Sequence, residues 1–152
     1  MTVWRLERKK YAEDAFTGEG ARLYGNRFNS KGTRVVYAAE NLPLALLEVL
    51  VGLTDYDQLH QYVFFRAELP DPHVGERARE ELPVGWDTHP PTAASKRIGD
   101  AWVTAERSLA LRVPSVIVPY SYNYLINPTH PAFEEANIYE AETLPVDERL
   151  VS

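Results

Sequence analysis

The chain has 152 residues, a formal net charge of −6 and no cysteine. This length suits one domain with a core of its own, so we expect residues 1–152 to form a single domain. The excess of 22 acidic over 16 basic residues argues against direct binding of nucleic acid. The absence of cysteine excludes a disulfide framework, a thiolate nucleophile and a cysteine-ligated zinc.

No segment has the character of a targeting or membrane-spanning sequence. The first residues lack the long apolar run of a signal peptide, and no apolar run elsewhere is long enough to cross a bilayer. We therefore expect a cytoplasmic protein without a membrane partner.

The first part of the chain predicts two strands and a helix. Thr2 to Leu6 alternates apolar and polar residues as a short strand does. Val35 to Ala38 is β-branched and aromatic, which is typical of a buried strand. A helix then begins near Pro43, carries leucines at helical spacing and ends at Gly52.

The rest of the chain adds three strands, a helix and a long loop. Gln61 to Leu69 alternates cleanly and is the clearest strand. We expect His73 to Thr92 to be a surface loop and Ser95 to cap a helix that reaches about Leu111. Ser115 to Pro119 is a β-branched run that predicts a central strand, and Asn137 to Glu142 predicts a last strand. The mixture indicates an α+β fold.

Positive charge is concentrated in a glycine-rich loop between Gly20 and Ala39. This stretch contains four cations and no acid, and its glycines and asparagines allow a backbone to approach a ligand closely. Arg27 is the first candidate for an anion contact, because its planar guanidinium matches two phosphate oxygens. Arg22 and Arg34 are weaker candidates. The loop predicts a site for a phosphorylated small molecule.

One carboxylate stands out in the helix that follows. Glu48 is the only charge in that helix and shares a face with Leu44 and Val51. Acidic residues are rarely buried without a reason, so Glu48 is a functional candidate. Tyr37 ends the preceding strand, where its hydroxyl needs a partner. A tyrosine in such a place belongs more often to a core than to an active site.

Other familiar sites are absent. No Gly-x-Ser-x-Gly elbow surrounds Ser115, so the sequence does not indicate a serine hydrolase. The four histidines are scattered without metal-ligand spacing, and we expect no metal. Neither a phosphate-binding P-loop nor a dinucleotide fingerprint occurs.

The sequence resembles the RES-domain family over most of its length, from about Trp4 to Pro131. The matching segments are GNRFNSKG (25–32), VVY (35–37), LLEVL (46–50), VPS (113–115) and NYLINPTHP (123–131). The family is named after an arginine, a glutamate and a serine that its members share. By this resemblance those residues are Arg27, Glu48 and Ser115.

The resemblance implies a fold and a biological role. The fold would be one compact domain around a split, bent β-sheet, similar to ADP-ribosyltransferase toxins. RES-domain proteins are known as toxins of bacterial type II toxin–antitoxin pairs, and an Xre-type antitoxin would be the partner that blocks the active site. Family members destroy NAD+ by hydrolysis or phosphorolysis, and some transfer ADP-ribose to a protein.

The resemblance also implies roles for individual residues. Glu48 would stabilise the positive charge that develops on the ribose when the nicotinamide–ribose bond breaks. Arg27, helped by Arg5 and Arg22, would bind the diphosphate, and Tyr37 would orient the nicotinamide. NAD+ is then the substrate, and no cofactor is expected.

The last site candidates lie in the second half of the chain. Ser115 would hydrogen-bond nicotinamide or ribose, but Ser121 lies six residues later and is an alternative for the hydroxyl that faces the cleft. Asn123 is a further nucleotide-binding candidate. Asn26 and Phe28 depart from the Gly and Trp that are common in the family, which should change packing more than chemistry.

Three functions stay open at this point. The protein could cleave NAD+ with water or phosphate, which would deplete cellular NAD+ and arrest growth, or it could transfer ADP-ribose to a protein. It could also be a non-catalytic module that binds a nucleotide or docks the antitoxin. The stoichiometry with the antitoxin, and whether the toxin forms a homodimer within the complex, stay open as well.

Overall fold

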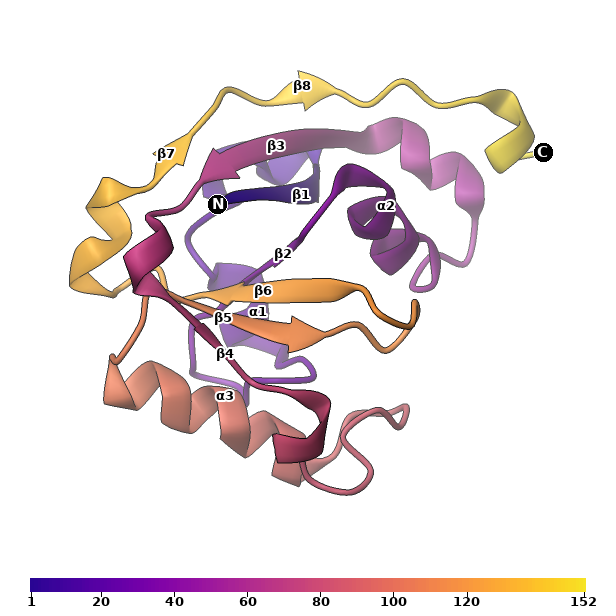
Figure 1. The fold of residues 1–152 in the computed structure, drawn as a ribbon. Coiled ribbons are helices and arrows are strands. Elements are labelled where there is room, and N and C mark those ends of the chain that lie inside the picture. The colour runs from indigo at the N-terminus through magenta and orange to yellow at the C-terminus, as the bar shows by residue number, and fades with distance from the viewer.

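The computed structural model describes residues 1–152, and its backbone is organised around an eight-stranded sheet (Figure 1). The strands are β1 (Thr2–Arg8), β2 (Val36–Ala39), β3 (Tyr62–Glu68), β4 (Val74–Glu76), β5 (Ala110–Pro114), β6 (Tyr122–Ile126), β7 (Asn137–Ile138) and β8 (Glu142–Thr143). The α-helices are α1 (Glu19–Tyr24), α2 (Leu42–Leu50) and α3 (Ala93–Ala105). Short 3₁₀ helices are η1 (Lys9–Asp14), η2 (Tyr56–Gln61), η3 (Asp71–His73), η4 (Arg79–Glu81), η5 (Pro131–Glu135) and η6 (Glu148–Leu150). None of the helices combines the length and apolar character that crossing a membrane requires.

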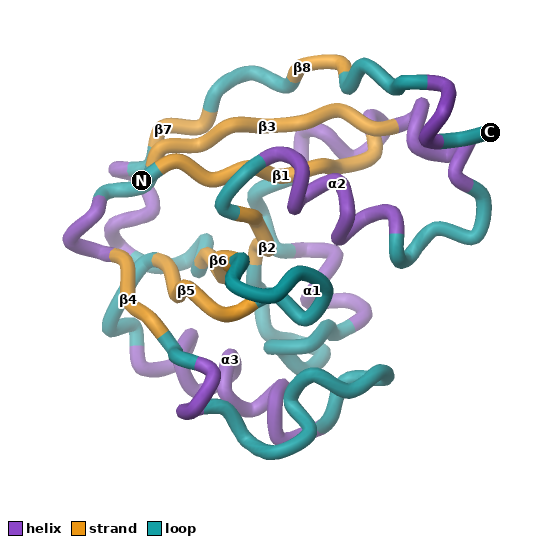
Figure 2. Tube along the Cα trace, turned by 45° about the vertical axis from the view of Figure 1, so that its right-hand side comes forward, coloured by secondary structure: helices purple, strands orange, loops and turns teal.

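The sheet is split between β1 and β2. These neighbours share a single residue pair, Trp4 with Ala39, whereas β1 pairs with β3 along its whole length. One half therefore contains β4, β5, β6 and β2, and the other contains β1, β3, β7 and β8, as the views in Figures 1 and 2 show. Only β4 and β5 pair in parallel. The expected α+β fold with a split, bent sheet is confirmed.

The two halves of the sheet enclose a buried cluster. It contains Val3 from β1, Ala67 from β3, Val36 from β2 and Ile126 from β6, each at most 1% exposed. Burial of apolar surface is the main stabilising contribution to folding. The halves are thus held together by side-chain packing more than by the hydrogen bonds between β1 and β2.

Helix α2 lies across the seam between the halves. Asn41 caps it by accepting a hydrogen bond from the backbone N–H of Leu44 at 2.8 Å. Leu44 is buried in a cluster with Leu6 of β1 and Ala39 of β2. The helix predicted from the leucine spacing is confirmed, and its position brings Glu48 to the seam.

Helix α3 covers the face of the β5–β6 half that is turned away from the Val3 cluster. Trp102 packs in a cluster with Phe28 from the glycine-rich loop and with residues of β5 and β6. Gly99 lies so close to the same loop that a Cβ there would collide with the Phe28 carbonyl oxygen. The Ser95 hydroxyl donates a hydrogen bond to the Arg27 carbonyl at 2.7 Å. α3 therefore fixes the backbone that carries Arg27.

The strand predicted over Ser115–Pro119 is wrong, because this segment turns the chain between β5 and β6. The Ser115 hydroxyl accepts hydrogen bonds from the backbone N–H groups of Ile117 at 3.0 Å and Val118 at 3.2 Å. Such local bonds compete with extended structure. The β-branched composition predicted a strand, because composition alone does not reveal these local hydrogen bonds.

The helix predicted over Ser95–Leu111 is shorter than expected. Thr92 caps it, accepting a hydrogen bond from the Ser95 N–H, and Glu106 ends it in a left-handed conformation with φ of 52°. From Ala110 the chain forms β5. Its side chains alternate between the cluster of Val3 and the cluster of Trp102.

Three smaller differences concern segments predicted as loops or as one strand. The predicted loop His73–Thr92 contains β4 and η4, and part of the glycine-rich loop forms α1. The last strand predicted over Asn137–Glu142 is instead two short strands, β7 and β8, that both pair with β3.

Gly99→Ala should destabilise the protein strongly, because the added methyl group would collide with the backbone of Phe28. We expect the free energy of unfolding to fall by about 3 kcal/mol or more, measured by chemical denaturation. Gly20→Ala in α1 is the matched control, since no atom lies within 4 Å of its Cβ position and its stability should hold or rise slightly. Equal stability of the two variants would contradict the close approach of α3 to this loop.

Candidate functional site

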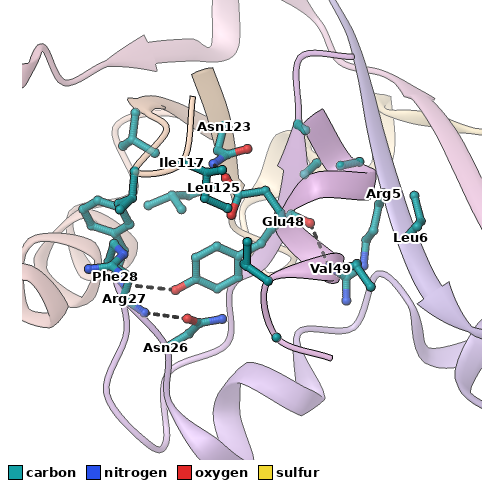
Figure 3. A pocket seen from close by; sticks show the side chains of 18 of the residues that line it. Arg5, Leu6, Asn26, Arg27, Phe28, Glu48, Val49, Ile117, Asn123 and Leu125 are labelled. Carbon is teal, nitrogen blue, oxygen red and sulfur yellow. Dashed lines mark hydrogen bonds between the residues drawn. The ribbon is translucent and has the colours of Figure 1, made fainter. Parts of the chain in front are cut away.

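A cavity of about 550 Å³ lies at the seam where β1 and β2 separate (Figure 3). Residues of β1, β2, β5, β6 and α2 line it together with the 26–28 segment and His89. Thirteen of its 20 lining residues are hydrophobic, and its charged side chains are Arg5, Arg27 and Glu48. A mostly apolar pocket with a few polar groups that fix orientation is typical of small-molecule sites.

Glu48 presents its carboxylate from α2 to this cavity (Figure 3). Its Oε1 accepts hydrogen bonds from Asn123 Nδ2 at 2.7 Å and from Ser115 Oγ at 3.1 Å. Its Oε2 has no hydrogen-bond partner in the protein. Two donors on one oxygen hold the carboxylate in one orientation and leave the other oxygen free for a ligand.

The two serine candidates have different places. Ser115 is buried, with 2% of its surface exposed, and lies behind Glu48 outside the cavity lining. Ser121 also lies outside the lining and contributes a backbone carbonyl, which accepts a hydrogen bond from the Ser115 N–H at 2.8 Å. Asn123, in contrast, both lines the cavity and bonds to Glu48. Of the two hydroxyls, that of Ser115 is the one connected to the site, through Glu48.

Arg27 lies on the opposite wall of the cavity. Its Nη1 donates to the carbonyls of Trp86 at 2.8 Å and Thr88 at 2.7 Å, while Nε and Nη2 have no partner in the protein. Partial burial lowers the pKa of Arg27, and the negative charges of Glu48 and Asp87 oppose this shift. Arg27 forms no direct ion pair with Glu48, so the space between them is open to a ligand that carries an anion.

Tyr37 lines the same cavity as these two residues. Its hydroxyl donates to Asn29 Oδ1 at 2.6 Å and accepts from the Phe28 N–H at 3.1 Å. Burial raises the pKa of Tyr37 above its usual range, so the phenol is neutral at physiological pH. Tyr37 can therefore pack against a ligand, but it does not act as a base.

Asn29 is a positioning residue that the sequence did not reveal. It is fully buried, and its Nδ2 donates to the carbonyls of Ala21, Ser30 and Thr33. Together with the hydrogen bond from Tyr37, these contacts fix the loop that carries Arg27. Nothing in the sequence separates Asn29 from any other loop asparagine.

Arg5 lines the cavity but uses most of its donors within the protein. Nη1 donates to the Tyr37 carbonyl at 2.7 Å, Nε to the Ala15 carbonyl at 2.8 Å, and Nη2 pairs with Glu7 at 3.1 Å. Burial lowers the pKa of Arg5, and Glu7 acts in the opposite direction. Arg5 can therefore attract a bound anion by its positive charge, but it has few free N–H groups to donate to that anion.

The remaining cations of the loop lie away from the cavity. Arg22 and Arg34 both bind Glu19, with Arg22 Nε and Arg34 Nη1 at 2.9 Å and 2.8 Å from Oε2. The hydrogen bond from Arg22, followed by the positive charges of both arginines, lowers the pKa of Glu19 to about 2. The acid-free stretch begins at Gly20, one residue after the acid that pairs with these cations.

The arrangement suits a ligand that has a cationic centre and an anionic group. Glu48 offers a free carboxylate oxygen to the first, and Arg27 offers the unpaired N–H groups of Nε and Nη2 to the second. No group of three or more histidine and acidic side chains lies together as metal ligands.

Comparison with known proteins identifies relatives along nearly the whole chain. The RES domain family model matches residues 2–147. Toxin Res of Photorhabdus laumondii subsp. laumondii is 36% identical over 152 residues, which cover 99% of this chain and 97% of the relative. Toxin Res of Yersinia enterocolitica is 36% identical over 88% of each chain. The Prs ADP-ribosylating toxin of Sphingobium sp. is 39% identical over 136 residues, 86% of this chain and 84% of that toxin.

Tyr37→Phe should lower stability, because Asn29 Oδ1 and the Phe28 N–H both lose a buried partner. We expect the free energy of unfolding to fall by about 1–3 kcal/mol, the usual effect of leaving a buried polar group unsatisfied. Thermal or chemical denaturation measures this. Tyr24→Phe is the control, since Tyr24 is 77% exposed. A Tyr37 variant as stable as the Tyr24 variant would show that this hydroxyl does not hold the loop.

Proposed function

The chain belongs to the RES-domain family, and we propose that it is a toxin that cleaves NAD+ at the nicotinamide–ribose bond. The observation that carries this proposal is the pairing across one cavity of an oriented carboxylate, Glu48, with a partly unpaired guanidinium, Arg27. NAD+ has the matching features, a positively charged nicotinamide ribosyl group and a diphosphate. The relatives support the biological role, since each of those described above is named a toxin.

The chemistry follows from where charge develops. As the bond between ribose C1′ and the nicotinamide nitrogen breaks, its electron pair stays on the nitrogen and nicotinamide departs neutral. The ribose then carries positive charge, which a nearby carboxylate stabilises in the transition state. Glu48 Oε2 is the free oxygen for this role, and Asn123 and Ser115 hold it in place. A water molecule that bonds to C1′ and releases a proton completes the hydrolysis, and phosphate in its place would give phosphorolysis.

Binding and reaction would be divided between the two walls of the cavity. Arg27 would hold the diphosphate through the N–H groups that it does not donate to the loop, and the buried charge of Arg5 would assist. Tyr37 would pack against the nicotinamide. Since nicotinamide leaves as a neutral molecule, no general acid is needed, and the Tyr37 hydroxyl can keep its hydrogen bond to Asn29.

A second candidate function is transfer of ADP-ribose to a protein. The Sphingobium relative, named a Prs ADP-ribosylating toxin, favours it. The same bond of NAD+ breaks, and a protein side chain takes the place of water at C1′. Mass spectrometry of proteins incubated with labelled NAD+ separates the two reactions, because transfer gives modified protein and hydrolysis gives free ADP-ribose.

A toxin requires a partner that restrains it, and we propose an Xre-family antitoxin that covers the cavity. Val51 of the α2 terminus and Val116 of the β5–β6 turn support this, because both line the cavity while 67% and 39% of their surfaces are exposed. Exposed apolar side chains around a pocket are suited to contact with another protein. Growth arrest on expression of the toxin alone, relieved by the antitoxin, is the expected behaviour.

Glu48→Gln should keep the shape of the side chain and remove its charge. We expect NAD+ cleavage to fall by about 10²–10³-fold, as for loss of one electrostatic contact to a transition state. NMR of NAD+ with purified protein, with and without phosphate, reports the rate and the product together. Glu134→Gln, at an exposed position outside the cavity lining, is the control. An unchanged rate in Glu48→Gln would contradict this role, and bound NAD+ without any product from the wild type would indicate a non-catalytic module.

Arg27→Ala should weaken NAD+ binding by roughly tenfold to a hundredfold, the range for a charge-assisted hydrogen-bond pair. Arg27→Lys should lie in between, because it keeps the charge and loses the planar fork. Calorimetric titration on the Glu48→Gln background measures affinity without turnover. Arg97→Ala, an exposed arginine of α3, should bind as the unsubstituted protein does. Equal affinity of the Arg27 and Arg97 variants would place the diphosphate elsewhere.

A further inference from the structure

A second cavity of about 300 Å³ adjoins the first. Arg5, Asn26 and Tyr37 line both cavities and form the boundary between them. The remaining walls of the second cavity come mainly from β1, the end of η1 and helix α1. The two cavities therefore meet at these three residues, and a ligand that fills the first reaches the border of the second.

The two cavities differ in charge. The first contains two guanidinium groups, Arg5 and Arg27, and one carboxylate. The second contains Arg5 together with the carboxylates of Glu7, Asp14 and Glu19. Glu7 is paired with Arg5, and Glu19 is paired with Arg22 and Arg34, so Asp14 is the one carboxylate without a cationic partner. Because this cavity holds an unpaired carboxylate while Arg27 offers free donors in the other, a phosphate is favoured in the first cavity over the second. An uncharged group suits the second.

An exposed aromatic side chain lines the second cavity. Tyr24 is the last residue of α1, lines this cavity and is 77% exposed, and its hydroxyl has no hydrogen-bond partner in the protein. The helix ends there because Gly25 adopts a φ of 73°. Exposed aromatic faces at nucleotide sites commonly stack on bases.

Building on the proposed function, we propose that the second cavity binds the adenosine half of NAD+. Glu48 lines the first cavity and not the second, so the nicotinamide–ribose bond lies in the first cavity and the diphosphate lies near Arg27. Adenosine is the part that remains, and it enters the second cavity with its base against Tyr24. The carboxylates can accept hydrogen bonds from ribose hydroxyls, and the unpaired Asp14 repels a 2′-phosphate. The site therefore selects NAD+ over NADP+.

The first test measures binding of 5′-AMP, which lacks the nicotinamide half, by calorimetry. Tyr24→Ala should weaken it about tenfold, as expected for loss of one base–aromatic stack. Leu23→Ala is the matched control, because Leu23 precedes Tyr24 on α1, is 47% exposed and lies outside both cavities. Undiminished affinity in Tyr24→Ala, or no binding of 5′-AMP to the folded wild type, would overturn the inference.

The second test concerns the 2′-phosphate. The wild type should bind 5′-AMP more tightly than adenosine 2′,5′-bisphosphate, by about tenfold, since the unpaired carboxylate of Asp14 repels the added charge. Asp14→Lys should reduce this difference, and because Asp14 is exposed and forms no ion pair the variant should fold. Equal affinity of the wild type for the two nucleotides would contradict the charge argument.

These outcomes are distinct from those for the proposed function. Binding of 5′-AMP that depends on Tyr24, in a protein that never cleaves NAD+, would support the adenosine site and reject the catalytic proposal. Cleavage of NAD+ with the same KM in wild type and Tyr24→Ala would support catalysis and reject the adenosine site. Cleavage of nicotinamide mononucleotide should not respond to Tyr24→Ala in either case.

Discussion

The separation of β1 from β2 is the constraint on which the site depends. Adjacent strands normally satisfy each other's backbone groups, but here the single pair Trp4–Ala39 remains. The guanidinium of Arg5 takes the place of the missing ladder by donating to the Tyr37 carbonyl across the gap. A guanidinium that is largely removed from water is tolerated when its donors are paired, and Ala15 and Glu7 complete that pairing. The cavity lies where β1 and β2 no longer form hydrogen bonds with each other.

The position of Arg27 illustrates how the fold prepares this space for a ligand. Its side chain is tied to the carbonyls of Trp86 and Thr88, and its own carbonyl is tied to Ser95 on α3. Two other parts of the chain, the 86–88 segment and α3, thus converge on one residue of a glycine-rich loop. Groups that are fixed before the ligand arrives lose little entropy on binding, which is the general advantage of a preorganised site.

The sequence predicted the charged residues of the site better than the residues that hold them. Glu48 was recognisable as a lone acid on an apolar helix, and the α+β class followed from the mixture of strand and helix patterns. Neither Asn29 nor Ser95 has a local signal in the sequence. The hydrogen bond between Asn123 and Glu48 has none either, because Asn123 lies 75 residues from its partner. Neutral polar residues are common in loops, and only the tertiary structure shows which of them are buried.

The outer edge of β3 has a consequence for the behaviour of the molecule in a crowded cell. β7 and β8 cover this edge with two residue pairs each, and between them the Tyr139 N–H donates to the Arg66 carbonyl at 3.0 Å. Arg66 also lies over the Tyr139 ring, and Leu144 is buried just beyond β8. An uncovered strand offers its hydrogen-bonding groups to strands of other molecules. The last segment of the chain thus protects the protein against edge-to-edge aggregation while the seam on the other side of β1 stays open.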